Sequence, residues 1–233
     1  MKTKYSLVLP CLNEFDNLKI LIPQIMRVIN KFRYEIVLVD DNSEDQTIPK
    51  LRKILKKKVK IKYILRKNKR SLGLSVKEGI KNSKGNVIIV MDTDFNHRPQ
   101  DLKKMINIFK KKNFDMVCGS RFLKGGSSNT FFRHFCSLVF NIFVNLVTGG
   151  KLSDNLSGFF IIKKKFLRKN LNKIFYGYGD FYIRLLYFIQ KQNISIFDFP
   201  IKYDLRKYGV SKSKLVKMLI SYSIETIKLK VKY

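Results

Sequence analysis

The chain has 233 residues, 45% of them hydrophobic, which is long and apolar enough for one sizeable core and excludes intrinsic disorder. Its 48 lysines and arginines stand against 17 acidic residues, a formal net charge of +31. This excess indicates a polyanionic partner (nucleic acid, an anionic membrane surface or a phosphorylated substrate), although lysines spread over solvated faces explain much of it equally well. The three isolated cysteines and two histidines argue against a disulfide framework or a zinc site and fit a reducing cytosolic setting.

The first half of the chain alternates short apolar runs with segments of helical spacing. The runs that predict strands are YSLVLP (5–10), YEIVLVD (34–40), KIKYIL (60–65) and NVIIVMD (86–92). The segments that predict helices between them are 17–29, 48–55 and 74–80. This alternation predicts an α/β fold with a mainly parallel sheet covered on both faces.

The second half has a different pattern. Helices are predicted at 131–147, 182–190 and 215–230, strands within 155–167 and 194–203, and a basic loop at 204–214. Since no repeat or linker is visible, we expect one domain over 1–214, with 215–233 as part of it or as a membrane-surface appendage. The N-terminal apolar run is soon interrupted by Asn13 and Glu14, unlike a signal peptide, and no stretch reaches the roughly 18 apolar residues of a bilayer span.

Polar clusters follow three of the predicted strands: PCLNE, DDNSEDQT and DTD. In parallel α/β sheets ligands bind at the carboxyl ends of strands, so these clusters predict the site. Asp92 and Asp94 can ligate Mg²⁺ or Mn²⁺, which often bridge carboxylates to substrate phosphates; the alternative is a turn that caps the helix beginning near Pro99. Asp40 or Asp41 can accept hydrogen bonds from a base or a ribose, or can cap the next helix, and the following loop brings Arg70 to the same edge.

The order of PCLNE, VDDNSEDQT, RSLGLSVKEGIKNSKGNVIIVMDTD, CGSRF and SGFF resembles family 2 glycosyltransferases with the GT-A fold. GSRFLKGG, LSGFF, GDFYIRLLY and FPIKYDLRKYGVSK look more narrowly like the dolichyl- or polyprenyl-phosphate sugar transferases. The resemblance covers roughly residues 4–214. It implies an inverting hexosyl transfer from a nucleotide sugar to a polyprenyl phosphate, with GDP-mannose as the first expected donor and UDP-glucose as the second.

The resemblance also assigns residues on the donor side. The implied donor-binding residues are Pro10, Asn13, Glu14, Asp40 or Asp41, Arg70, Arg206 and Lys212. The implied metal ligands are Asp92, Asp94 and Asn96; many relatives have glutamine at the last of these positions, so asparagine is a shorter substitute.

On the acceptor side, the resemblance points to Arg121, Arg133, Ser137 and Asp154. A lipid phosphate is already anionic near neutral pH and needs positioning more than a base, and arginine forks suit its oxygens. Ser137 lies four residues after Arg133, on the same helix face. A hydroxyl acceptor would instead need a base, for which Asp180 is the candidate.

The segments 131–147 and 213–233 mix apolar and basic or polar residues, typical of helices that lie on a membrane surface, although packing onto the sheet or a dimer contact would use the same pattern. We therefore expect a cytoplasmic protein, peripheral at the inner face of the membrane, that docks by itself or through a membrane partner subunit. A basic nucleic-acid-binding protein with its footprint at 50–70 is a distant alternative. No nucleic-acid motif is present, so no nucleic acid is expected as a partner.

Overall fold

The computed structural model describes residues 4–55, 61–127, 131–204, 206–209 and 215–233. The elements are β1 (Tyr5–Cys11), α1 (Phe15–Ile29), β2 (Tyr34–Asp40), α2 (Thr47–Ile54), β3 (Ile61–Leu65), α3 (Leu72–Lys81), β4 (Val87–Val90), α4 (Pro99–Lys112), β5 (Met116–Ser120), α5 (Phe131–Thr148), β6 (Phe160–Lys163), the 3₁₀ helix η1 (Lys164–Asn170), α6 (Leu171–Ile174), α7 (Phe181–Gln190), β7 (Ile196–Pro200) and α8 (Leu215–Lys232). The strands and helices expected from the sequence are all present, with ends shifted by a few residues.

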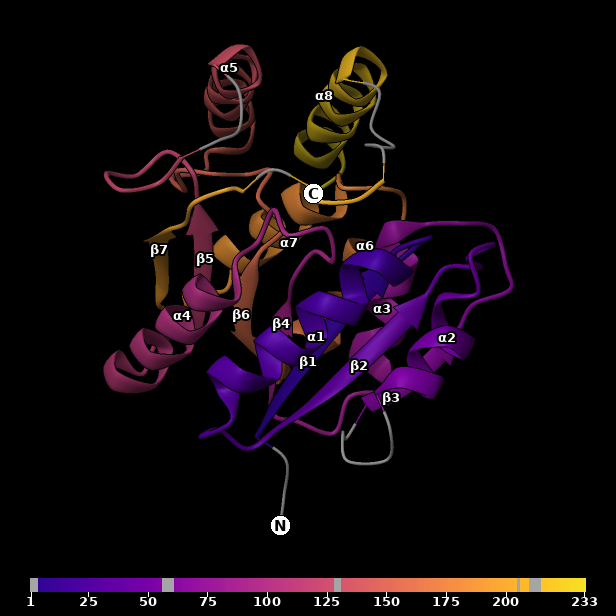
Figure 1. Ribbon diagram of the computed structural model, residues 1–233. Helices are drawn as coiled ribbons and strands as arrows, with labels where there is room; N and C mark the ends of the chain where they lie inside the picture. The colour runs from indigo at the N-terminus through magenta and orange to yellow at the C-terminus, as the bar shows by residue number, and fades with distance from the viewer. Residues whose placement is uncertain (1–3, 56–60, 128–130, 205, 210–214) are drawn as a thin grey trace.

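The strands form one seven-stranded sheet in the order β3-β2-β1-β4-β6-β5-β7 (Figure 1). β1 pairs parallel with β2 and β4, β2 with β3, and β5 with β7, whereas β6 runs antiparallel between β4 and β5. The prediction of a mainly parallel sheet is therefore confirmed. The sequence analysis missed β5, because MVCGS is short and half of it is small or polar.

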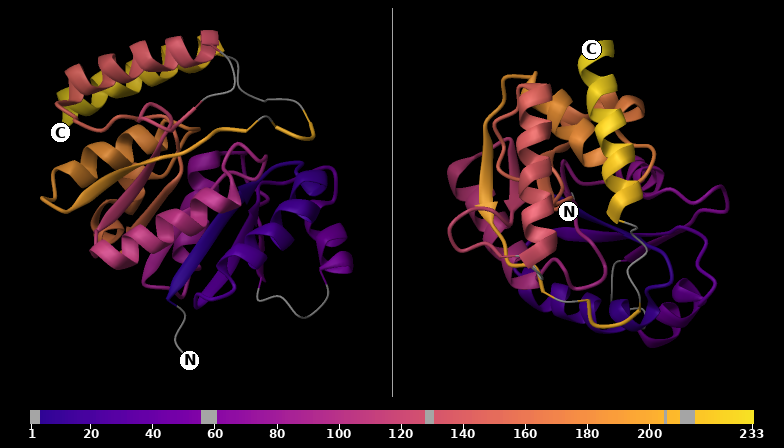
Figure 2. Two further views of the ribbon diagram at one scale, coloured as in Figure 1. Left: turned by 60° about the vertical axis from the view of Figure 1, so that its left-hand side comes forward. Right: turned by 90° about the horizontal axis from the view of Figure 1, so that it is seen from above.

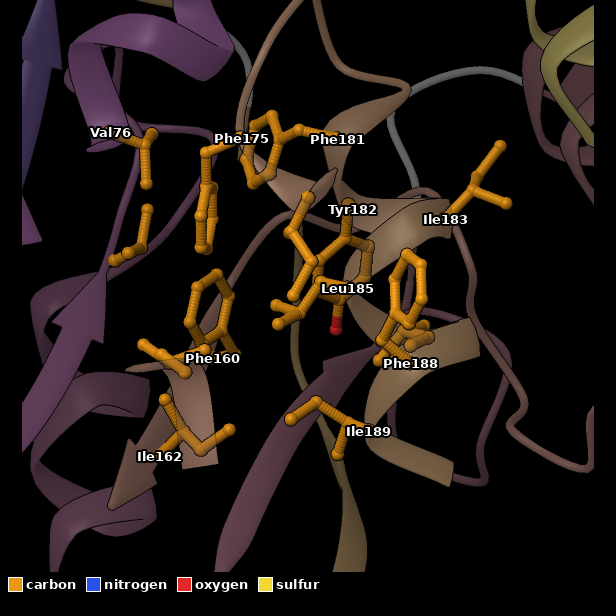
Figure 3. Packing of buried hydrophobic residues seen from close by; sticks show 14 of the residues in the cluster. Val76, Phe160, Ile162, Phe175, Phe181, Tyr182, Ile183, Leu185, Phe188 and Ile189 are labelled. Atoms are coloured by element: carbon orange, nitrogen blue, oxygen red, sulfur yellow. The ribbon is translucent and has the colours of Figure 1, made fainter. Parts of the chain in front are cut away.

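Helices cover both faces of the sheet, and each face has its own apolar cluster. On one face, the side chains of α1, α2 and α4 pack on the sheet, with Leu18, Leu21 and Met105 fully buried. On the other, α3, α6 and α7 pack around Phe160, whose ring stacks on Tyr182 at 5.8 Å between centroids (Figure 3). The apolar runs of β1, β2 and β4 follow from this arrangement, since both sides of each strand are covered.

Helices α5 and α8 lie side by side over the carboxyl end of the sheet (Figures 1 and 2). Each contributes buried side chains to the core on the α7 side, Phe140 and Val144 from α5 and Tyr222 and Leu229 from α8. The rings of Phe140 and Tyr222 lie 6.5 Å apart. None of the helices described is both long enough and apolar enough to cross a bilayer.

Candidate active site

A cleft of about 390 Å³ opens at the carboxyl ends of β1 and β4, between the loop after β5 and the helix α8. Ten of the residues predicted for the site line it: Pro10, Glu14, Asp41, Arg70, Asp92, Asp94, Asn96, Arg121, Ser137 and Arg206. Met218 and Tyr222 of α8 also line it, so the C-terminal helix forms part of the wall. The polar clusters that follow separate strands thus meet in one place.

The other predicted residues lie elsewhere. Asn13, Asp40, Asp154 and Asp180 are described, and they are not among the residues that line the cleft. Arg133 lies in the first turn of α5, but its side chain is outside the described part of the structure, and Lys212 lies outside the described residues altogether.

The turn after β4 presents its two aspartates to the cleft. Asp94 Oδ1 accepts the backbone N–H of Asn96 at 3.1 Å, and Asp94 Oδ2 accepts Asn96 Nδ2 at 2.9 Å. Phe95, between Asp94 and Asn96, is buried and has a φ of +74°, a conformation that costs a bulky residue about 1–3 kcal/mol. Such strain persists where the surrounding structure imposes it, which is typical of functional turns.

The buried side chain of His97 holds this turn in place through hydrogen bonds, a role that the sequence analysis missed. Its Nδ1 accepts the backbone N–H of Asp92 at 2.9 Å, while Nε2 lies 3.1 Å from the carbonyl oxygen of Ser157 and 2.9 Å from the hydroxyl of Tyr203. An imidazole that accepts at Nδ1 and donates at Nε2 is neutral. Burial agrees with this, since it lowers the pKa of His97 to about 3.

His97 should make folding stability depend on pH. Below pH 6.5 the unfolded chain binds a proton at this imidazole that the native state does not bind, so the free energy of unfolding falls as the pH falls. Between pH 6.5 and 5 we expect wild type to lose about 1.6 kcal/mol relative to His97→Asn, as measured by urea unfolding at each pH. His134→Asn removes the other histidine and serves as the control; if it changes the pH dependence as much as His97→Asn does, His97 is not the cause.

The cleft holds several carboxylates close together. Burial, followed by the charge of Asp94, raises the pKa of Asp92 to about 8, and burial also raises the pKa of Glu14. Arg206 partly compensates these charges, because its guanidinium donates to Glu14 Oε1 and to Asp94 Oδ2, both at 2.8 Å. The acidic end of the cleft therefore attracts a cation.

The oxygen atoms at this end of the cleft form a donor set for a divalent metal ion. Over the described stretches of the chain, no three His, Cys, Asp or Glu side chains are arranged to hold a metal by themselves. An Mg²⁺ or Mn²⁺ ion that keeps waters and binds substrate phosphates needs only one or two carboxylates, however. Asp92 and Asp94, with Asn96 beside them, fit an ion that is shared with a phosphorylated ligand.

Arg121 faces the cleft from the loop after β5, and Asp154 holds it in place. Arg121 Nε donates to Asp154 Oδ2 at 2.7 Å and Nη2 donates to Oδ1 at 2.9 Å, a bidentate pair. Asp154 is fully buried, and only 11% of the Arg121 side chain is exposed. Burial alone would lower the pKa of Arg121, but the Asp154 carboxylate outweighs it and raises that pKa, so the guanidinium stays charged.

Another ion pair, between Arg66 and Asp41, lies beside the cleft. Asp41 accepts a hydrogen bond from Arg66 and also the backbone N–H of Ser71, at 2.6 Å. Arg70, which lines the cleft, donates to the carbonyl oxygen of Asn42 at 2.9 Å. Arg66 was not predicted as a site residue, because only the pairing of β2 with β3 brings it beside Asp41.

Two of the predicted donor residues have roles in the loops behind the cleft. Asp40 is buried and accepts the backbone N–H of Ser43 at 2.8 Å. Asn13 Oδ1 accepts the backbone N–H of Glu44 at 2.7 Å. In the structure, therefore, Asp41 rather than Asp40 faces the ligand space, and Asn13 joins the loops after β1 and β2.

Asp180, just before α7, forms an ion pair and a hydrogen bond within the protein. Its carboxylate pairs with the fully buried Arg184 at 2.5 Å and accepts the backbone N–H of Tyr178 at 2.7 Å. Arg184 also pairs with Glu225 of α8 at 2.9 Å. The cluster ties α8 to the loop that carries Tyr178, which does line the cleft.

Comparison with known proteins agrees with this architecture. The family model described as "Glycosyl transferase family 2" matches residues 6–171. Dolichol-phosphate mannosyltransferase of Pyrococcus furiosus is 33% identical over 217 residues, covering 91% of this chain and 59% of that protein. Dolichyl-phosphate beta-glucosyltransferase of Dictyostelium discoideum is 26% identical over 214 residues, covering 85% of this chain and 65% of that protein. The chain thus spans less than two thirds of the length of either relative.

Solved structures show the same fold. Glucosyl-3-phosphoglycerate synthase of Mycobacterium tuberculosis, in complex with Mn²⁺, uridine diphosphate and phosphoglyceric acid, superposes with a TM-score of 0.70 at 16% identity. The match covers 97% of this chain and 77% of that one. The GT-A fold expected from the sequence is confirmed, and with the family model matching most of the chain, the protein belongs to glycosyl transferase family 2.

Proposed function

We propose that the protein transfers a hexosyl group from a nucleotide sugar to a polyprenyl phosphate. One observation carries the proposal: a charged arginine, Arg121, held by the buried Asp154, faces the same cleft as Asp92 and Asp94. The cleft thus has an acidic end suited to a metal-bound diphosphate and a basic group suited to a second phosphate. The relatives named for dolichyl-phosphate mannosyl and glucosyl transfer support the same acceptor and leave the sugar open between mannose and glucose.

On the donor side, Asp92 and Asp94, with Asn96, would hold Mg²⁺ or Mn²⁺. When bound, the ion would neutralise charge on the leaving nucleoside diphosphate. Arg206 and Arg70 would add positive charge around that diphosphate, with Lys212 predicted to join them, and Asp41 would accept hydrogen bonds from the nucleoside. GDP-mannose remains our first choice of donor and UDP-glucose the second.

On the acceptor side, Arg121 would bind the lipid phosphate, with Ser137 on the neighbouring helix and Arg133 as a further predicted contact. A phosphate oxygen attacks the anomeric carbon of the sugar and forms a new C–O bond. The bond from that carbon to the diphosphate oxygen breaks, the configuration inverts, and the diphosphate leaves with the electron pair. An anionic phosphate needs no base, which suits a cleft whose Glu14, Asp41 and Asp94 carboxylates are paired with arginines.

The lipid would be met at an anionic membrane surface. Exposed apolar side chains follow one face of α5 (Phe132, Phe135, Val139, Ile142 and Leu146) and one face of α8 (Ile220, Ile224, Ile227 and Val231). The two helices lie side by side, and Lys228, Lys230 and Lys232 are exposed on α8 (Figure 2). We infer that these faces lie on the inner, cytoplasmic face of the membrane, alone or with a membrane partner subunit.

Vesicle binding tests this surface. Leu146 and Val231 are 79% and 82% exposed, and burying each in the bilayer interface contributes about 1.5 kcal/mol or more. Leu146→Glu combined with Val231→Glu should therefore weaken binding to phosphatidylglycerol vesicles at least about tenfold in a flotation assay. Ile54→Glu, an exposed residue on α2, is the control. Equal losses in both variants would contradict the assignment of the membrane face.

The test of the activity is transfer from radiolabelled GDP-mannose or UDP-glucose to polyprenyl phosphate, with Mg²⁺ or Mn²⁺ and with EDTA. We expect a lipid-linked product from one donor that disappears with EDTA. Asp180→Asn separates this reading from transfer to a hydroxyl: turnover should persist if the acceptor is a phosphate, whereas a near-complete loss with normal donor binding would support Asp180 as a base. Lack of product with every donor and acceptor would refute the proposal.

A further inference from the structure

A second cavity, of about 490 Å³, lies at the opposite end of the sheet from the active-site cleft. Four segments form it: the start of β1, the turn before β4, the end of α4, and the end of β6 with the start of η1. Because β6 is antiparallel to β4, Lys163 pairs with Val87 at this edge. Tyr5 of β1 lines this cavity, and Pro10 of the same strand lines the active-site cleft. Five residues of extended strand separate them, so the two sites are roughly 16 Å apart along β1.

The lining of this cavity is strongly basic. No acidic residue is found among the described residues that line it. Lys163, at its edge, pairs with Asp115 at 2.9 Å. The other cationic side chains that line it are Lys4, Lys84, Lys110, Lys164, Lys165 and Arg168. The active-site cleft differs, since Glu14, Asp41, Asp92 and Asp94 face its arginines.

One further observation distinguishes the cavity from an ordinary lysine-rich surface. Lys164 is half-buried, and its Nζ donates to the carbonyl oxygen of Ser83 at 2.7 Å. Burial, followed by the charge of Arg168, lowers the pKa of Lys164, while the Glu35 carboxylate raises it. A bound anion would favour the charged form of Lys164, which burial disfavours.

We propose that this cavity binds a soluble, multiply charged phosphate anion, such as an inorganic or organic polyphosphate. The cavity is lined by ammonium groups, one guanidinium and the amides of Asn86 and Asn113, which mostly donate hydrogen bonds. A phosphate chain presents many acceptor oxygens and several negative charges in a small volume, which matches six such cations. A lipid headgroup fits less well, because the apolar faces of α5 and α8 lie at the other end of the molecule from the start of β1 (Figure 1).

Calorimetric titration of the full chain with inorganic tripolyphosphate tests the site, in EDTA and at about 0.15 M salt. Lys164→Gln combined with Arg168→Gln should bind at least about tenfold more weakly than wild type. The matched control is Lys103→Gln with Lys104→Gln, which removes the same charge from exposed positions on α4 and should bind like wild type. Equal weakening in both double variants, or no saturable binding by wild type, would overturn the proposal.

One further variant keeps the result interpretable. Arg206→Gln removes a cation of the active-site cleft and should bind tripolyphosphate like wild type. Weak binding by Arg206→Gln, with normal binding by the Lys164 and Arg168 double variant, would place the anion in the cleft and refute the second site.

Vesicles distinguish the source of the phosphate. Both double variants should bind vesicles that contain a phosphoinositide equally well, because the cavity faces away from the proposed membrane surface. If the Lys164 and Arg168 double variant alone loses vesicle binding, and tripolyphosphate binds all variants alike, the ligand is a lipid headgroup and the proposal of a soluble anion is wrong.

Discussion

Asp92→Asn should reduce the turnover of hexosyl transfer about 100- to 1000-fold and, at the same time, raise the Tm measured in EDTA. The loss of turnover follows because an amide binds a divalent cation weakly and leaves the charge of the departing diphosphate less compensated. The gain in Tm follows from relieving the burial of this carboxyl group and its repulsion by Asp94. The pKa of Asp92 in the folded chain is about 8, far above its ordinary value, so the ionised carboxylate is destabilised by burial and by Asp94.

Steady-state kinetics over a range of Mn²⁺ concentrations, together with thermal unfolding in EDTA, would measure both effects. Asp16→Asn is the matched control, since the Asp16 carboxylate is 59% exposed and pairs only with Lys19 among its described neighbours. It should leave the turnover unchanged. Normal turnover in Asp92→Asn would mean that the metal, if one is used, does not depend on this carboxylate.

Much of the fold could be predicted from local pattern. The apolar runs of β1, β2 and β4 are continuous because these strands are buried on both faces, and that signal survives in a single sequence. The order of the strands is not local information. β6 enters the sheet antiparallel between β4 and β5, and nothing in FIIK indicates that neighbour. β5 was missed because its sequence, MVCGS, ends in Gly119 and Ser120 and so lacks the continuous apolar run that marks the other strands.

The site divides in the same way. Clusters at strand ends could be predicted, because the carboxyl ends of parallel strands share one edge; Asp92, Asp94 and Glu14 were found by this argument. Residues whose partners come from distant elements could not. His97 reaches the backbone of Ser157 and Arg66 reaches Asp41, and both contacts depend on strand order. Asp180, the candidate base for a hydroxyl acceptor, pairs with Arg184 one helical turn later.

Asp154→Asn should destabilise the fold by about 3 kcal/mol, because it leaves the buried guanidinium of Arg121 without a compensating charge. The asparagine can still accept one of the backbone N–H groups, of Arg121 or Leu156, that Asp154 accepts now, so the loss reports mainly on charge. Urea unfolding at pH 7 would measure it. Asp16→Asn, at an exposed carboxylate, should change the free energy of unfolding by less than about 0.5 kcal/mol.

Adding Arg121→Met to Asp154→Asn separates stability from function. The double variant no longer buries an uncompensated charge, so it should recover most of the lost free energy of unfolding. Its transfer to polyprenyl phosphate should nevertheless remain about 100-fold or more below wild type, because no guanidinium is left to bind the acceptor phosphate. Donor binding, followed with the nucleoside diphosphate and Mn²⁺, should stay near wild type, since the acidic end of the cleft is intact. If turnover returns together with stability, Arg121 holds the loop after β5 in place and does not bind the acceptor.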